Sequence, residues 1–162
     1  MSANGRVVTG WSPELPCGTE CDVLVGRRAT RYWDLHAPRP LLPAPDGSLL
    51  LGRGETRRPD LRAGPGQRQD ALVHFVPGVS GNAYVAVRGP RADGRARAEA
   101  AAVYRTGQDA PVVTFDAADD IDLSRADQGL DQTVILVPEA RVLITVAGSD
   151  RTKLVLRRVD LK

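Results

Sequence analysis

The sequence contains few of the residues from which active sites and metal centres are built. Only two cysteines, Cys17 and Cys21, and two histidines, His36 and His74, occur in 162 residues, and aromatic side chains make up 4% of the chain. No serine lies in a Gly-x-Ser-x-Gly elbow, and the glycine-rich segments lack the following helix that a phosphate-binding loop requires. We therefore expect no catalytic residues, no cofactor and no enzymatic activity.

Long apolar runs are also missing. No segment reaches the roughly 18–20 consecutive apolar residues of a membrane span, and residues 1–6 lack the apolar stretch of a secretory signal. The sequence thus predicts no membrane partner and a cytoplasmic or virion location, although a secreted protein with a replaced leader would give the same pattern.

Lysine is scarce, since Lys153 and Lys162 are the only lysines beside 20 arginines. Together with frequent alanine, glycine and proline, this indicates codon bias in a GC-rich genome or host. Residues 1–105 carry 15 arginines and 10 acidic residues, whereas residues 106–162 carry 7 basic and 10 acidic residues. This asymmetry suits packing between copies of the chain, and the shortage of aromatic stacking residues disfavours nucleic acid as a partner.

The length predicts one domain, residues 1–162, with one core. Residues 71–162 are expected to form an antiparallel β core, because short β-branched runs alternate with turn residues. Residues 95–105 are ambiguous: the alanines favour a helix, but charged residues alternate with alanine, as in a strand. The flanking turns favour the strand. The expected strands are a hairpin over 71–88, then 95–105, 111–115, two within 133–147, and 153–161.

The strands after residue 133 are rich in valine, isoleucine and leucine, so we expect them at the centre of the sheet. Several short strands at this spacing are typical of an antiparallel β-sandwich or a jelly-roll-like barrel. The fold class predicted from the sequence is therefore all-β.

Residues 1–70 differ from the rest, because eight of the twelve prolines lie between Pro13 and Pro65. Residues 37–45 resemble polyproline, and residues 36–70 are too interrupted to predict a core of their own. We expect an extended arm, rich in proline, glycine and arginine, that lies along its own domain or along neighbouring copies. Short strands are expected at residues 6–11, 22–25, 31–35 and 48–51.

Cys17 and Cys21 lie close together in Pro16-Cys-Gly-Thr-Glu-Cys21. With His36 and His74 they match the ligand types of a structural zinc site, but the two histidines are far apart in the sequence rather than close together on one element. A loop disulfide and two unlinked thiols remain the alternatives.

The stretch from Asp116 to Asp131 is the densest cluster of oxygen ligands. Counted from Asp120, the oxygen side chains at loop positions 1, 3, 5 and 12 match an EF-hand-like calcium loop: Asp120, Asp122, Ser124 and Asp131. Position 6, which should be glycine, is arginine. The sequence therefore favours a solvated β connection, in which Ile121 and Leu123 point inward, over a calcium site.

Four aromatic residues are candidates for contact with a ligand or a neighbouring subunit: Trp11, Tyr32, Trp33 and Tyr84. Aromatic faces stack on sugars and apolar ligands, but they also pack in cores and interfaces. The same four residues would therefore serve either a binding module or a structural protein.

These observations favour a non-catalytic structural or interaction protein of a homo-oligomeric assembly. Its partners would be copies of itself and other assembly proteins, and its most concrete form is a phage virion accessory protein, for capsid decoration or in the tail. The alternative is a ligand- or carbohydrate-binding β-sandwich, or a small β-barrel enzyme with an apolar pocket.

Overall fold

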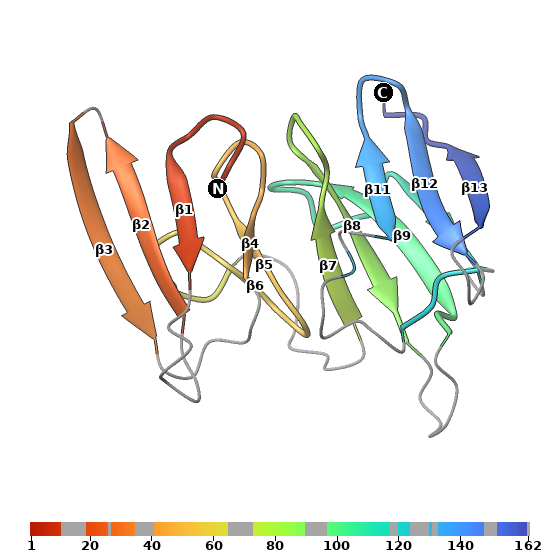
Figure 1. Cartoon of the computed structure of the whole chain (residues 1–162), viewed down its shortest axis with the longest axis horizontal. Helices are drawn as coiled ribbons and strands as arrows, with labels where there is room; N and C mark the ends of the chain where they lie inside the picture. The colour runs from red at the N-terminus through yellow and green to blue at the C-terminus, as the bar shows by residue number, and fades with distance from the viewer. Residues whose placement is uncertain are drawn as a thin grey trace.

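The computed structural model of the chain is all-β: every named element in the part that it describes is a strand, and the strands form four antiparallel sheets. Figure 1 shows the sheets following one another along the long axis in chain order, with β3 at one end and β13 at the other. The structure describes residues 1–10, 19–25, 27–34, 41–64, 73–89, 97–116, 120–123, 130, 133–147 and 152–161.

Each sheet is built from strands that are consecutive in the sequence. The first contains β1 (Val7–Gly10), β2 (Thr19–Val25) and β3 (Arg28–Asp34), and the second contains β4 (Leu42–Pro43), β5 (Leu50–Leu51) and β6 (Thr56–Arg57). The third contains β7 (Val73–Pro77), β8 (Ala83–Arg88), β9 (Ala100–Arg105) and β10 (Val113–Phe115), and the fourth contains β11 (Val134–Val137), β12 (Val142–Ala147) and β13 (Lys153–Arg158).

The strands expected in the second half are confirmed. The first hairpin, β7–β8, turns at residues 78–82, where Gly81 adopts a φ of 68° that glycine tolerates at little cost. Of the ambiguous segment, Ala100–Arg105 is a strand paired on both sides. Arg97 makes an isolated bridge with Asp122, and residues 95 and 96 lie outside the described residues. The two strands within residues 133–147 and the last strand also form as predicted.

The expectation that residues 36–70 carry no core is wrong for residues 41–64, and these residues do not form a bare arm. They pair as the second sheet, and all their leucines except the half-buried Leu42 are buried. The proline-rich pattern hid this because each strand is only two residues long, too short to show a period. The other arm residues, 35–40 and 65–70, lie outside the described residues.

Three buried clusters replace the single core that the length predicted. The N-terminal core lies between the first two sheets, the middle core between the second and third, and the C-terminal core between the third and fourth. Their largest members are Val7, Leu41, Leu50 and Leu61 in the first, Leu49, Leu51, Phe75 and Tyr84 in the second, and Val85, Val103, Ile121, Leu136 and Leu143 in the third.

Strand alternation explains why the cores are separate. Successive side chains of a strand point to opposite faces. In β5, Leu50 therefore enters the N-terminal core and Leu51 the middle core. In β8, Tyr84 enters the middle core and Val85 the C-terminal core. The second and third sheets are thus covered on both faces.

The strands after residue 133 do not form the centre of the fold, contrary to expectation. They make the last sheet, which packs its inner face on the third sheet through Val134, Leu136 and Leu143. Their continuous apolar sequence is typical of strands buried on both faces, yet β13 alternates between exposed and half-buried residues after its two exposed first residues. The outer face of the last sheet is therefore less covered than the apolar sequence of its strands predicts.

Candidate functional site

The acidic stretch is tied into the fold by an ion pair. Both carboxylate oxygens of Asp120 accept hydrogen bonds from Arg157 of β13, one of them at 2.9 Å, and the Thr145 hydroxyl also donates to Asp120. The Arg157 guanidinium lies 5.7 Å from the centre of the Phe115 ring, within cation–π range. Asp120 therefore neutralises a half-buried arginine between the third and fourth sheets.

Of the remaining calcium candidates, the structure describes only Asp122, which does not join Asp120 in a metal site. Asp122 is exposed and pairs as an isolated bridge with Arg97, while Ser124 and Asp131 lie outside the described residues. In the described part of the chain, no three His, Cys, Asp or Glu side chains gather in a way that could hold a metal ion. Ile121 and Leu123 point inward as expected and pack in the C-terminal core.

The pKa of Asp120 is set by opposing effects. Burial favours the neutral acid, but the hydrogen bonds from Arg157 and Thr145 and the charge of Arg157 are stronger and hold the pKa of this carboxyl below its usual range. Asp120 thus stays ionised at neutral pH and serves as the counter-ion of Arg157.

The cysteine and histidine candidates are only partly placed. Cys21 is a free thiol buried in the N-terminal core, and burial, with a contribution from Asp22, raises its pKa to about 11. It is therefore protonated at neutral pH and a poor nucleophile or metal ligand. His74 lies half-buried in β7, and Cys17 and His36 lie outside the described residues.

The aromatic candidates do not form one binding surface. Tyr84 is 3% exposed and stacks on Tyr104 with ring centres 5.5 Å apart, while Phe75 packs edge-on against it at 6.1 Å. Burial is the largest cause that raises the pKa of Tyr84 to about 12. Tyr32 packs against the N-terminal core, whereas the next residue, Trp33, is 52% exposed. Trp11 lies outside the described residues.

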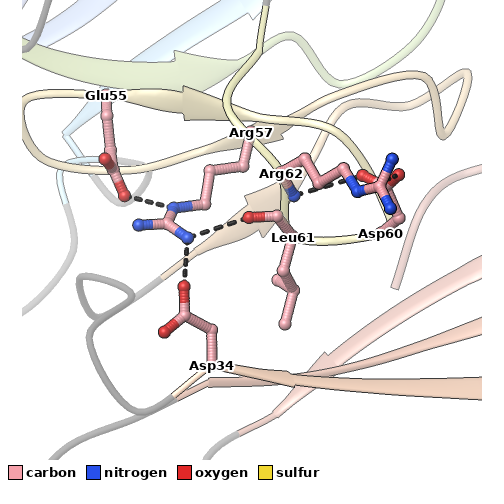
Figure 2. Close-up of polar contacts among 6 residues, drawn as sticks. All are labelled: Asp34, Glu55, Arg57, Asp60, Leu61 and Arg62. Atoms are coloured by element: carbon pink, nitrogen blue, oxygen red, sulfur yellow. Dashed lines mark hydrogen bonds and ion pairs between the residues drawn. The ribbon is translucent and has the colours of Figure 1, made fainter.

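A cluster around Arg57 was not found from the sequence. Figure 2 shows the guanidinium donating to the carboxylates of Asp34 and Glu55 and, at 2.8 Å, to the carbonyl oxygen of Leu61. The two carboxylates raise the pKa of Arg57 despite its burial. The spacing of Glu55 and Arg57 is compatible with one strand face, but Asp34 lies far from both in the sequence and gave no signal. The cluster joins the end of β3 to β6.

The outer face of the last sheet is apolar across all three strands except at Arg158, the last residue of β13. The side chains that alternate with the buried ones are half-buried in β11 and β12 and exposed in β13. The strand register places Ile144 between Ile135 and Leu156. The complete set is Ile135, Val137, Val142, Ile144, Val146, Leu154 and Leu156; we call it the apolar outer face.

The exposed ends of this face are unusual for a sheet that meets water. Leu154 is 61% exposed and Leu156 is 66% exposed. The outer face of the first sheet provides a comparison, because there Asp22 and Arg31 form an ion pair at 2.9 Å across two strands. Antiparallel sheets with one solvated face normally carry such polar residues outward. Among the strand residues of the last sheet's outer face, only Arg158 is of this kind, paired with Asp160 at 3.3 Å. The apolar outer face is therefore the best candidate for a contact site.

No family model, no curated protein and no solved structure matches this chain.

Within the described residues, no helix has the length and hydropathy needed to cross a bilayer. The polar clusters around Arg57 and Asp120 hold sheets together, and the buried Cys21 and Tyr84 are protonated and enclosed. Their geometry is that of structural contacts. The apolar outer face, by contrast, offers a surface to another molecule.

Proposed function

We propose that this protein is a non-catalytic structural protein of a homo-oligomeric assembly. The observation that carries the proposal is the apolar outer face of β11–β12–β13. In β11 and β12 the sequence has the nearly continuous apolar pattern of strands covered on both faces, while the described part of the chain covers only one face. Neighbouring copies that cover the second face would bring sequence pattern and environment into agreement.

The specific form of the proposal is a phage virion accessory protein, for capsid decoration or in the tail. The stacked sheets supply a rigid body, and the third and fourth sheets, which face each other across the C-terminal core, are proposed to act as a β-sandwich. The arginine-rich composition supports an origin in a GC-rich host. Other assembly proteins are the expected further partners.

The test of this proposal uses Ile144→Lys, at the centre of the apolar outer face. Size-exclusion chromatography with light scattering should show that the wild-type chain self-associates. Burial of one isoleucine contributes about 1.5–3 kcal/mol, so its replacement by a charge should weaken association by roughly tenfold or more.

Leu24→Lys is the matched control, because Leu24 is half-buried on the outer face of the first sheet and also lies in a central strand. It should leave association unchanged. A wild-type chain that stays monomeric at high concentration would show the proposal to be wrong.

A second candidate function, carbohydrate or ligand binding, is favoured by one observation, the exposure of Trp33. An exposed indole can stack on a sugar ring. Titration with glycans should then quench tryptophan fluorescence in the wild-type chain and not in Trp33→Ala.

A further inference from the structure

The outer edge of β13 offers backbone groups as well as side chains. The Val159 amide donates to the Arg141 carbonyl oxygen at 2.8 Å, and this bond fixes the phase of the β12–β13 ladder. In an antiparallel ladder, alternate residues bond to the neighbouring strand and the others point away. Lys153, Val155 and Arg157 therefore bond toward β12. The N–H and C=O groups of Leu154, Leu156 and Arg158 point toward the opposite edge.

The two leucines on this edge are the same residues whose side chains are about two-thirds exposed. Pairing of β13 with β12 runs without interruption over six residues, and the strand contains no proline, glycine or bulge. Prolines and bulges are among the features that usually protect an edge from pairing with another strand. Charged residues, another protective device, stand at the two ends of the strand: Lys153 at its start and Arg157 and Arg158 at its end. The central residues 154–156 are apolar.

In the described part of the chain, the edge strands β7 and β11 are covered, whereas β3 is, like β13, an edge strand paired on one side. The Phe75 amide in β7 donates to the Gly52 carbonyl oxygen at 3.1 Å, and the Val73 carbonyl oxygen accepts from Gly54 at 2.6 Å. The outer edge of β11 receives the Val79 amide on the Leu136 carbonyl oxygen at 2.9 Å. For Leu154 and Leu156, no such bond to a described residue is found. The outer edge of β13 is therefore open, whereas the outer edges of β7 and β11 are covered by backbone hydrogen bonds.

Charge permits a second copy of the same strand to lie beside β13. Of its three basic residues, Arg157 pairs with Asp120, and Arg158 pairs with Asp160 at 3.3 Å. Lys153 remains. In an antiparallel pair centred on Val155, the two copies of Lys153 would be separated by four residues, roughly 13 Å along the strand. This exceeds the Debye length of about 8 Å at physiological ionic strength, so their repulsion is largely screened. Lys153 would lie opposite the partner subunit's Arg157, whose charge is neutralised by the Asp120 of its own chain.

We propose that two copies of this chain pair through their β13 edges, antiparallel, about a twofold axis at Val155. Leu154 then lies opposite Leu156 of the partner subunit, and the reverse pair follows by symmetry. The two last sheets become one six-stranded sheet with a continuous apolar outer face. This inference rests on the proposed function and names the contact by which its smallest oligomer forms.

The size of the contact sets its strength. Six residues of strand span about 20 Å, and an edge of this length buries much less than the roughly 800 Å² per partner of a stable interface. The pair is therefore expected to dissociate on dilution, unless further copies cover the enlarged apolar face.

The test is backbone amide hydrogen exchange of the full chain, measured by NMR at low and high protein concentration. The amides of Val155 and Arg157 bond to β12 and should be protected at both concentrations. The amides of Leu154 and Leu156 should exchange rapidly in dilute solution and at least tenfold more slowly in concentrated solution. Light scattering on the same samples reports whether oligomers are present.

Leu156→Pro provides the matching variant. Proline removes an N–H that points away from β12, so the ladder inside the sheet keeps its bonds, and proline is tolerated at such positions on edge strands. The variant should lose the concentration-dependent protection of Leu154. Leu156→Lys, which keeps the N–H and adds charge to the edge, should weaken pairing in the same direction if the proline variant does not fold.

The possible results distinguish edge pairing of β13 from the proposed structural function on which it rests. Oligomers whose Leu154 and Leu156 amides exchange at the same rate as in dilute solution would overturn edge pairing and leave the structural function standing. A chain that never self-associates would overturn both. Protection limited to these edge amides, lost in the Leu156 variants, supports the pairing of β13 strands.

Discussion

Replacement of Arg57 by methionine should destabilise the N-terminal part of the molecule. The Arg57 side chain is 13% exposed, and its partners Glu55 and Asp34 are 12% and 27% exposed. Methionine removes the positive charge and leaves two half-buried carboxylates and the Leu61 carbonyl oxygen without this donor.

The magnitude follows from burial. Removal of one partner from a buried ion pair costs about 3–5 kcal/mol. Here solvent reaches part of each carboxylate, so we expect a loss of roughly 2–4 kcal/mol in the free energy of unfolding. Arg31→Met is the control, because Arg31 is 64% exposed and pairs with Asp22 at the surface. It should cost less than about 1 kcal/mol.

Urea unfolding followed by two signals provides the assay. Both tryptophans, Trp11 and Trp33, precede the second sheet in the sequence, so their fluorescence reports on the N-terminal part, while far-ultraviolet circular dichroism reports on all sheets. With a slope of about 2 kcal/mol per molar urea, Arg57→Met should lower the fluorescence midpoint by about 1–2 M. Equal, small shifts for Arg57→Met and Arg31→Met would refute the reasoning.

Two further predictions concern acid stability and a close backbone contact. Because the folded-state pKa of Asp120 is lowered, its contribution to stability is complete above the unfolded pKa of about 3.9 and is lost as pH falls through the folded pKa. Asp120→Asn should therefore be less stable at pH 7 and should flatten the loss of stability below about pH 4, measured by urea midpoints, and an unchanged acid profile would contradict this. A Cβ on Gly64 would lie 2.5 Å from Thr56 Oγ1 and 2.8 Å from its carbonyl oxygen, whereas one on Gly10 would meet no atom within 4 Å. Gly64→Ala should thus lower the free energy of unfolding by about 1–3 kcal/mol, and a thermal melt indistinguishable from that of Gly10→Ala would rule out the clash.

Local patterns predicted the strands of the second half well. Turn residues around Gly78–Asn82 and 138–140 separate runs of clear strand type, and pairing between neighbours in sequence follows from them. They could not predict the second sheet, because two-residue strands such as Leu50–Leu51 have no readable period. Their burial is decided by sheets on either side.

The sites depended still more on distant contacts. The carboxylate of Asp120 suggested a calcium ligand by its spacing, but its partner Arg157 lies 37 residues away. Arg57 meets Asp34 across 23 residues. Sequence spacing carries no information on such pairs without the fold. The apolar runs of β11 and β12 correctly predict strands but wrongly predict a central position, because the order of the sheets is not encoded in local patterns.

The agreement between chain order and sheet order has a consequence for synthesis. Each sheet consists of neighbours in sequence, and the inner face of the first sheet packs on residues of the second, which leave the ribosome next. Vectorial translation can therefore cover each apolar face soon after it forms, with few long-range contacts delayed until the end. The exception is the outer face of the last sheet. Its leucines in β13 are about two-thirds exposed in the described part of the chain, so any cover over them has to come after the four sheets are in place.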